Sequence, residues 1–165
     1  MRIQDQVAIV TGGASGIGES VGAALAARGA RTVALVDRDE RVVEVASSVN
    51  AAAQRTVAAP FVGDVTDDAF RCHVFDEVTA RGGLPRLCVP AAGITRDTLA
   101  VKLSKGTGEP EVYSADTFRQ VLEINLTAPT YWALELIARI ARDRRAQGLP
   151  RWEPTDPMQG AVVLV

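Results

Sequence analysis

Residues 11–18 of the chain read TGGASGIG, and this glycine-rich stretch is the strongest local indication of the fold. It follows directly on the apolar residues 6–11 and leads into an Ala-rich segment with helical spacing. A strand that enters a helix through glycines turns tightly and aims backbone N–H groups at an anion. The alternative, a plain strand-to-helix turn, would explain the glycines alone. The predicted diphosphate-binding residues are Gly12, Ser15, Gly16, Ile17 and Gly18.

Short apolar runs alternate with helix-length segments along the whole chain. The runs carry few charges, which is typical of strands buried on both faces of a parallel sheet. We therefore predict an α/β, Rossmann-type doubly wound parallel sheet with strand order 3-2-1-4-5, as a single dinucleotide-binding domain over residues 1–165. Residues 94–115 and 142–159 are rich in Gly, Pro and charge, and are predicted to be loops with at most one short helix. The predicted strands are 6–11, 32–37, 57–62, 86–91 and 160–165, and the predicted helices are 18–29, 39–53, 67–82 and 114–148.

Composition excludes several classes of protein. With 18 basic and 20 acidic residues the net charge is −2, so no strong field would attract nucleic acid or anionic lipid. No uninterrupted apolar stretch reaches the roughly 20 residues of a membrane span. The cysteines, Cys72 and Cys88, fit no metal-ligand spacing. We expect a cytoplasmic protein with free thiols and no metal, nucleic-acid or membrane partner.

Two aspartates follow predicted strands, at the edge of the sheet where ligands collect. Asp37 ends the second strand, about twenty residues after the glycine loop, where a carboxylate can bond the adenosine ribose hydroxyls and repel a 2′-phosphate. We therefore predict NAD rather than NADP, although the neighbouring Arg38 can partly offset the repulsion. Asp64, with Val65, is predicted to face the adenine. The alternative is that the polar residues 64–68 only start a helix, and both can hold at once.

These motifs occur in the order that is found in the short-chain dehydrogenase/reductases, and the chain resembles that family. The matching residues are TGGASGIG at 11–18, DR at 37–38, GDV at 63–65, AAG at 91–93 and NLTAPTYW at 125–132. The resemblance implies that Ala92 and Gly93 also bind the cofactor, and that the protein forms a homodimer or homotetramer through its long helix. Within the family, AAGITRD at 91–97 is most similar to the 3-oxoacyl-acyl-carrier-protein reductases.

The chain departs from the family pattern at two places. The two asparagines that usually precede the Ala-Gly after the fourth strand are replaced by Pro90 and Ala91, which removes amide hydrogen bonds near the nicotinamide. Reductases that use NADP tend to carry a basic residue in the glycine loop, where this chain has Ala14 and Ser15. The second departure favours NAD.

Asn125 lies inside the predicted long helix, and Pro129 follows four residues later. Proline has no N–H, so it cannot bond the carbonyl of Asn125 in the helical ladder. The family resemblance implies a catalytic role for Asn125, in which it holds a water that links the catalytic lysine to solvent. The alternative is a proline kink that only shapes the helix.

Catalysis in this family uses a Ser, a Tyr and a Lys four residues after the Tyr. Neither lysine fits, because Thr98 and Val101 stand four residues before Lys102 and Lys105. We therefore expect the chain to be the amino-terminal part of a longer enzyme, with later strands and the catalytic residues beyond position 165. The resemblance implies reduction of a small-molecule or acyl-carrier-bound ketone, in the first place of a 3-oxoacyl thioester to its 3-hydroxyacyl form. Alternatives are a dehydrogenase of 3-hydroxyacyl-CoA, steroids or sugar alcohols, or a catalytically incomplete nucleotide-binding fragment.

Overall fold

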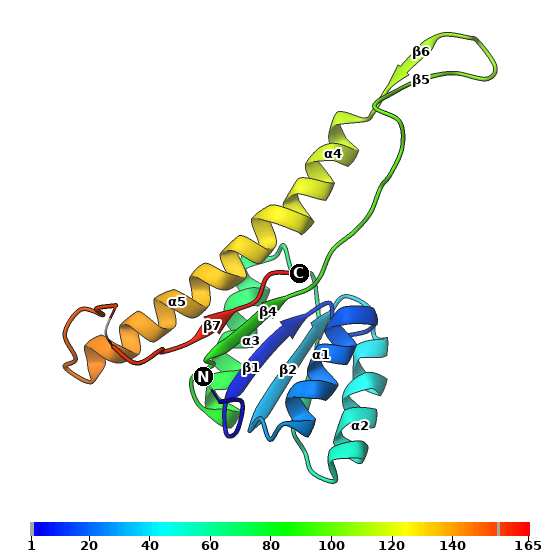
Figure 1. Cartoon of the computed structure of the whole chain (residues 1–165). Helices are drawn as coiled ribbons and strands as arrows, with labels where there is room; N and C mark the ends of the chain where they lie inside the picture. Colours follow the sequence, from blue (N-terminus) through cyan, green and yellow to red (C-terminus); the bar gives the residue numbers. More distant parts are fainter. Residues whose placement is uncertain (1, 155) are drawn as a thin grey trace.

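A computed structural model describes residues 2–154 and 156–165 of the chain (Figure 1). A parallel five-stranded sheet forms its centre, in the order β3-β2-β1-β4-β7. This confirms the predicted Rossmann-type sheet, with β7 in the place of the fifth predicted strand. The strands are β1 (Val7–Thr11), β2 (Thr32–Asp37), β3 (Ala58–Val62), β4 (Leu87–Pro90) and β7 (Ala161–Val162).

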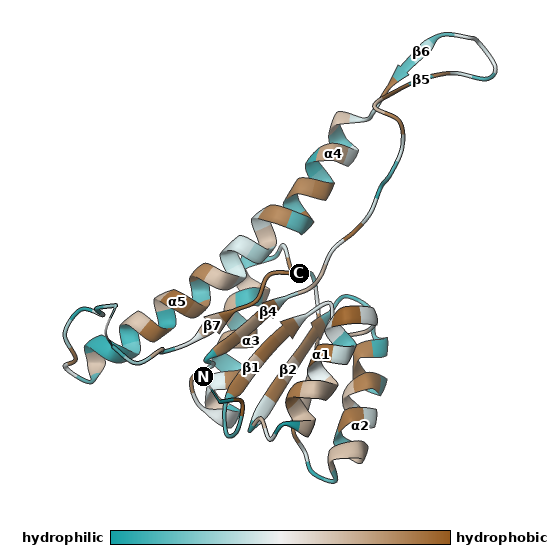
Figure 2. Cartoon of the chain, in the orientation of Figure 1, coloured by the Kyte–Doolittle hydropathy of each residue, from teal (hydrophilic) through white to brown (hydrophobic). Residues whose placement is uncertain are grey.

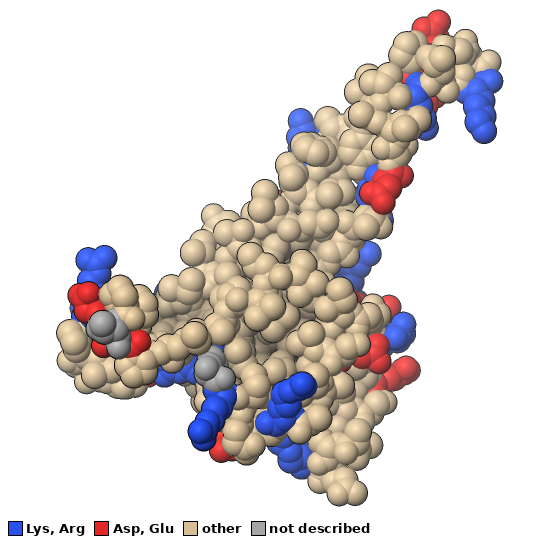
Figure 3. Space-filling view, in the orientation of Figure 1, with Lys and Arg blue, Asp and Glu red and all other residues tan. Residues whose placement is uncertain are grey.

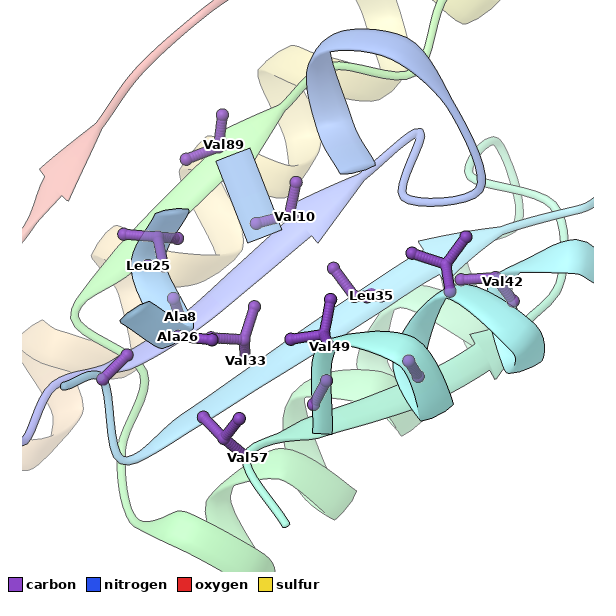
Figure 4. Packing of buried hydrophobic residues seen from close by; sticks show 14 of the residues in the cluster. Ala8, Val10, Leu25, Ala26, Val33, Leu35, Val42, Val49, Val57 and Val89 are labelled. Atoms are coloured by element: carbon purple, nitrogen blue, oxygen red, sulfur yellow. The ribbon is translucent and has the colours of Figure 1, made fainter. Parts of the chain in front are cut away.

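Helices cover both faces of the sheet, which is why its central strands lack a polar alternation. All five residues of β1 are buried. Helices α1 (Gly16–Ala27) and α2 (Arg41–Ala53) pack on one face, where Leu25 and Val49 meet Val10, Val33 and Leu35 (Figure 4). Helices α3 (Asp68–Gly82) and α5 (Ala128–Ala146) pack on the other face through a second buried cluster.

The predicted helix over 114–148 is present, but one turn of it is wider than an α-helix. Helix α4 (Ala115–Leu122) continues through a π-helical turn, η1 (Glu123–Thr127), into α5. In that turn the N–H of Ala128 donates to the carbonyl of Glu123, five residues earlier. The π-turn ends two residues before Pro129, which has no N–H to donate to a carbonyl of the preceding turn.

The prediction of a loop over 94–115 is wrong for part of that segment. Strands β5 (Val101–Leu103) and β6 (Pro110–Val112) form an antiparallel hairpin that projects beyond α4 (Figure 1). Val101 lies opposite Val112 and Leu103 opposite Pro110, whereas Lys102 and Glu111 form a cross-strand ion pair of 3.2 Å. The short polar and apolar alternation is that of a hairpin.

The last predicted strand, 160–165, is shorter and less buried than expected. Only Ala161–Val162 pairs with β4, and residues 163–165 are more than half exposed. The N–H of Val163 still donates to the carbonyl of Cys88, at 3.0 Å. The next rung of a parallel ladder would need an N–H from Pro90, which has none. The pairing therefore stops where that proline stands.

Surface properties agree with the mixed composition. Acidic and basic side chains are interspersed on the face shown in Figure 3, without one large area of a single sign. Hydrophobic residues concentrate in the strands of the sheet and along stripes of α4 and α5 (Figure 2). Across residues 2–154 and 156–165, no helix has both the length and the apolar character needed to cross a bilayer.

Candidate functional site

The carboxyl ends of β1 to β4 surround a cleft of about 410 Å³. Loops leave parallel strands at this edge, so residues from distant parts of the sequence meet there. Asn125 does not line the cleft, but it is hydrogen-bonded to Ile94, which does. The lining includes every predicted cofactor residue, namely Gly12, Ser15, Gly16, Ile17, Gly18, Asp37, Arg38, Asp64, Val65, Ala92 and Gly93.

The glycine loop makes a cradle between β1 and α1. A Cβ on Gly18 would lie 2.2 Å from the carbonyl oxygen of Gly12, so only glycine lets the two backbone segments approach this closely. Gly16 has φ +56°, and a Cβ there would have no described atom within 4 Å. The first turn of α1 therefore faces open space in the cleft, and its N–H groups are suited to bind a diphosphate.

Asp37 braces this loop as well as lining the cleft. One carboxylate oxygen accepts a hydrogen bond from the N–H of Ala14 at 3.0 Å, and the other accepts from the N–H of Asp39 at 3.1 Å. A carboxylate oxygen has two lone pairs, so each oxygen can still accept a bond from a ribose hydroxyl. The same side chain can thus hold the loop and a ligand.

Asp64 is kept ionised by its own loop. Its Oδ1 accepts hydrogen bonds from the N–H of Thr66 at 2.9 Å and from the hydroxyl of Thr66 at 2.8 Å. These two bonds lower the pKa of Asp64 below 3.8, with a smaller contribution from Arg38 and against the effect of burial. The helix α3 is capped by Asp67, whose Oδ1 accepts from two amides of the first turn. The alternative that this segment starts a helix is therefore confirmed at Asp67, whereas the contact of Asp64 with an adenine stays a prediction.

The loop after β4 is fastened from two sides. The amide side chain of Asn125 accepts a bond from the N–H of Ile94 at 2.9 Å and donates one to the carbonyl of Ile94 at 2.8 Å. On the other side, the N–H of Ala92 donates to the hydroxyl of Thr11 at 3.1 Å. These bonds brace the segment that lost the two family asparagines. The predicted role of Asn125 in holding a water stays a prediction.

Sequence reasoning missed several lining residues. Most are apolar or glycine and carry no chemical signal of their own, but they lie beside predicted residues, after a strand or, for Ile124, next to Asn125 in η1. Asp39 is the exception, because it adds a carboxylate to the cleft and its Oδ1 also accepts from the N–H of Arg41 at the start of α2. The missed residues are Ala14, Asp39, Gly63, Ala91, Ile94 and Ile124.

The sheet order and the glycine cradle define a Rossmann-type fold. The family model described as short chain dehydrogenase matches residues 6–148. The chain therefore belongs to the short-chain dehydrogenase family, whose members are oxidoreductases that use NAD or NADP. A structure described as a short-chain dehydrogenase from Novosphingobium aromaticivorans has the same fold, with a TM-score of 0.75 and 21% identity over 98% of this chain and 52% of that chain.

Curated relatives differ in the reactions that their names state. A short chain dehydrogenase from Pseudocercospora fijiensis is 30% identical, over 78% of this chain and 38% of its own length. A 2,3-dihydro-2,3-dihydroxybenzoate dehydrogenase from Bacillus subtilis is 37% identical over 62% of this chain and 38% of its own length. The 3-oxoacyl-[acyl-carrier-protein] reductase of Escherichia coli is 26% identical over 78% of this chain and 46% of its own length. The chain thus spans less than half of each.

Proposed function

We propose that the chain binds a nicotinamide dinucleotide across the carboxyl ends of β1 to β4, as part of an oxidoreductase. The observation that carries the proposal is the glycine cradle, which leaves open space at the start of α1 with Asp37 beside it. In the proposed complex, amides of residues 14–18 bind the diphosphate, Asp37 bonds the adenosine ribose, and Asp64 and Val65 lie at the adenine. The bound dinucleotide supplies hydride-transfer chemistry.

We propose NAD rather than NADP as the preferred dinucleotide. Three carboxylates, those of Asp37, Asp39 and Asp64, and one guanidinium, that of Arg38, line the cleft, and we propose that they surround the adenosine half of the dinucleotide. A 2′-phosphate in this region would lie among like charges, and Arg38 is already attracted to Asp64. The charge balance of the cleft therefore supports NAD.

The substrate that we propose is a ketone, a 3-oxoacyl thioester in the first instance. The similarity of residues 91–97 to the acyl-carrier-protein reductases supports this choice, as does the Escherichia coli relative. An alcohol dehydrogenase is the second candidate, because a D-threitol dehydrogenase from Mycolicibacterium smegmatis is 37% identical over 62% of this chain. Neither tyrosine of the chain begins a Tyr-x-x-x-Lys motif, so we assign these 165 residues to dinucleotide binding rather than to proton transfer.

We also propose that two copies associate through the helical rod formed by α4 and α5. The rod carries an exposed apolar stripe at helical spacing, and a second copy would bury it. Sedimentation of the wild type against a variant with Leu126 and Leu134 changed to Gln tests this point: the variant should be a monomer, and a monomeric wild type would contradict the proposal. The stripe contains Phe118, Leu122, Leu126, Leu134 and Ile137.

A cytoplasmic location is the last element of the proposal. Cys72 and Cys88 are free thiols, and Cys88 is fully buried in the core. Thiols persist in reducing compartments. Cell fractionation tests the location, and recovery of the protein from an oxidising compartment would contradict it.

The decisive experiment is calorimetric titration of Asp37→Asn with NADH and NADPH. The amide oxygen can still accept from Ala14, so the loop stays braced while the charge is removed. We expect the preference for NADH over NADPH to fall by about tenfold or more, since a charge-assisted bond contributes roughly 1.5–3 kcal/mol. Asp97→Asn is the control, because Asp97 is exposed and does not line the cleft, and it should leave the preference for NADH over NADPH unchanged. Failure of the wild type to bind either dinucleotide would refute the proposal.

A further inference from the structure

Trp132 is a fully buried residue of α5, and it reaches across the core to the loop after β3. Its side chain has 0% exposure, and its indole N–H donates to the carbonyl of Val65 at 2.9 Å. Val65 lies between β3 and α3, so neither the sheet ladder nor the helix ladder supplies a donor to that carbonyl. The indole therefore satisfies a backbone acceptor that the fold leaves open in the interior.

The peptide that Trp132 binds is held at both ends. The carbonyl of Val65 and the N–H of Thr66 belong to one planar peptide unit. The N–H of Thr66 donates to Oδ1 of Asp64 at 2.9 Å, while the carbonyl accepts from the indole. Because the unit is planar, a rotation that releases one bond also displaces the other. The orientation of the Asp64 carboxylate is thus coupled to the indole through a rigid link.

The indole itself has little freedom to move. The rings of Trp132 and Phe75 are 5.8 Å apart at their centroids, tilted by 34°. Phe75 is in turn covered by the guanidinium of Arg139, at 5.2 Å from its ring centroid. Trp132 also belongs to the second buried cluster, between the sheet and helices α3 and α5. The N–H that meets Val65 is consequently fixed by packing on the side away from the cleft.

We infer that Trp132 is a positioning residue for the adenine end of the cleft, acting through the Val65–Thr66 peptide on Asp64. The inference rests on the proposed dinucleotide binding. Asp64 and Val65 line the cleft, whereas Trp132 is not among its lining residues and lies in the buried cluster that includes Val65. Loss of its N–H should therefore weaken binding of the adenosine half of the dinucleotide and leave the nicotinamide half unaffected.

The test is Trp132→Phe, which keeps an aromatic ring in the core and removes the N–H. Titration with ADP-ribose should show an affinity at least fivefold lower than that of the wild type, whereas reduced nicotinamide mononucleotide should bind within twofold. Phe75→Leu is the matched control, because it disturbs the same cluster and leaves the bond to Val65 in place. Equal ADP-ribose affinity in Trp132→Phe and wild type, or an equal loss in Phe75→Leu, would overturn the inference.

A second measurement needs no ligand. Hydrogen exchange of the Thr66 amide should be at least tenfold faster in Trp132→Phe than in Phe75→Leu, when both are compared at equal global stability. Equal exchange in the two variants would show that the peptide is not held by the indole. If the wild type binds no dinucleotide, the proposed function fails, while the exchange experiment still decides whether Trp132 fixes the peptide.

Discussion

Gly18→Ala tests how closely the glycine loop and α1 must approach. The added Cβ would lie 2.2 Å from the carbonyl oxygen of Gly12, 2.6 Å from its carbonyl carbon and 3.0 Å from the carbonyl oxygen of Thr11. All three are backbone atoms, so no side chain can rotate out of the way. To reach an ordinary contact, α1 and the end of β1 must separate by about 1 Å.

The cost of this separation follows from the packing of the loop. Overpacking in a filled interior costs about 1–3 kcal/mol. For a chain of this size each kcal/mol lowers the melting temperature by about 2–4 °C, so we expect a decrease of roughly 2–12 °C. Binding should suffer more than stability, because the displaced amides are those that we propose for the diphosphate. A tenfold or greater loss of NADH affinity is the expected result.

Calorimetry measures both effects on one sample, by thermal unfolding and by titration with NADH. Gly106→Ala is the matched control: it is the same substitution in the hairpin loop, where a Cβ would meet no described atom within 4 Å. It should melt within about 1 °C of the wild type. If Gly18→Ala has the same melting temperature and the same NADH affinity as Gly106→Ala, the close approach of α1 to the end of β1 contributes nothing to stability or binding, and the reasoning is wrong.

Three further outcomes are expected. Asn125→Ala should lower the free energy of unfolding by about 1 kcal/mol through loss of its two bonds to Ile94. Asn125→Asp keeps the acceptor for the N–H of Ile94 but sets a carboxylate oxygen against the carbonyl of Ile94, so it should lower the free energy of unfolding at least as much. Equal stability of the wild type and both variants in a denaturant titration would contradict this. The pKa of Asp64 is lower in the folded protein than its ordinary value of 3.8, so the ionised side chain stabilises the fold above that pH, and this stabilisation is lost as the pH falls further. Below about pH 4, the free energy of unfolding should therefore fall less steeply with decreasing pH in Asp64→Asn than in the wild type. Burial raises the pKa of the Cys88 thiol to about 12, so iodoacetamide at neutral pH should label Cys72 first in the native protein, and mass spectrometry showing equal labelling would refute that.

Features with a strong local signal could be predicted from the sequence. The apolar runs placed β1 and β2 within a residue of their observed bounds, and the glycine spacing placed the cleft. The hairpin could not be foreseen in the same way, because its strands of three residues are shorter than any periodic pattern can reveal. The short pairing of β7 with β4 reflects a missing backbone donor at Pro90, and the effect of that proline depends on which strand lies beside it.

The residues of the candidate site likewise differ in whether the sequence carries a signal for them. Residues that we propose to act through their own chemistry, such as Asp37 and Asp64, could be singled out in the sequence because each follows a predicted strand. Trp132 did not, because a tryptophan in an amphipathic helix is normally explained by burial alone. Its partner is a backbone carbonyl 67 positions away in the sequence, and carbonyls carry no sequence signal. Such contacts become visible only when the fold is known.

The central place of β1 in the sheet has a consequence for how the chain folds. Ala8 pairs with Val33 on one side and with Leu87 on the other. Pairing of β1 with β2 closes a shorter loop than pairing with β4 and therefore costs less conformational entropy. The unit of β1, α1 and β2 can thus assemble while the other edge of β1 is still unpaired, because β4 is synthesised much later. A nascent chain on the ribosome would carry that open edge until β4 had been synthesised, which makes this interval the one in which a chaperone would matter most.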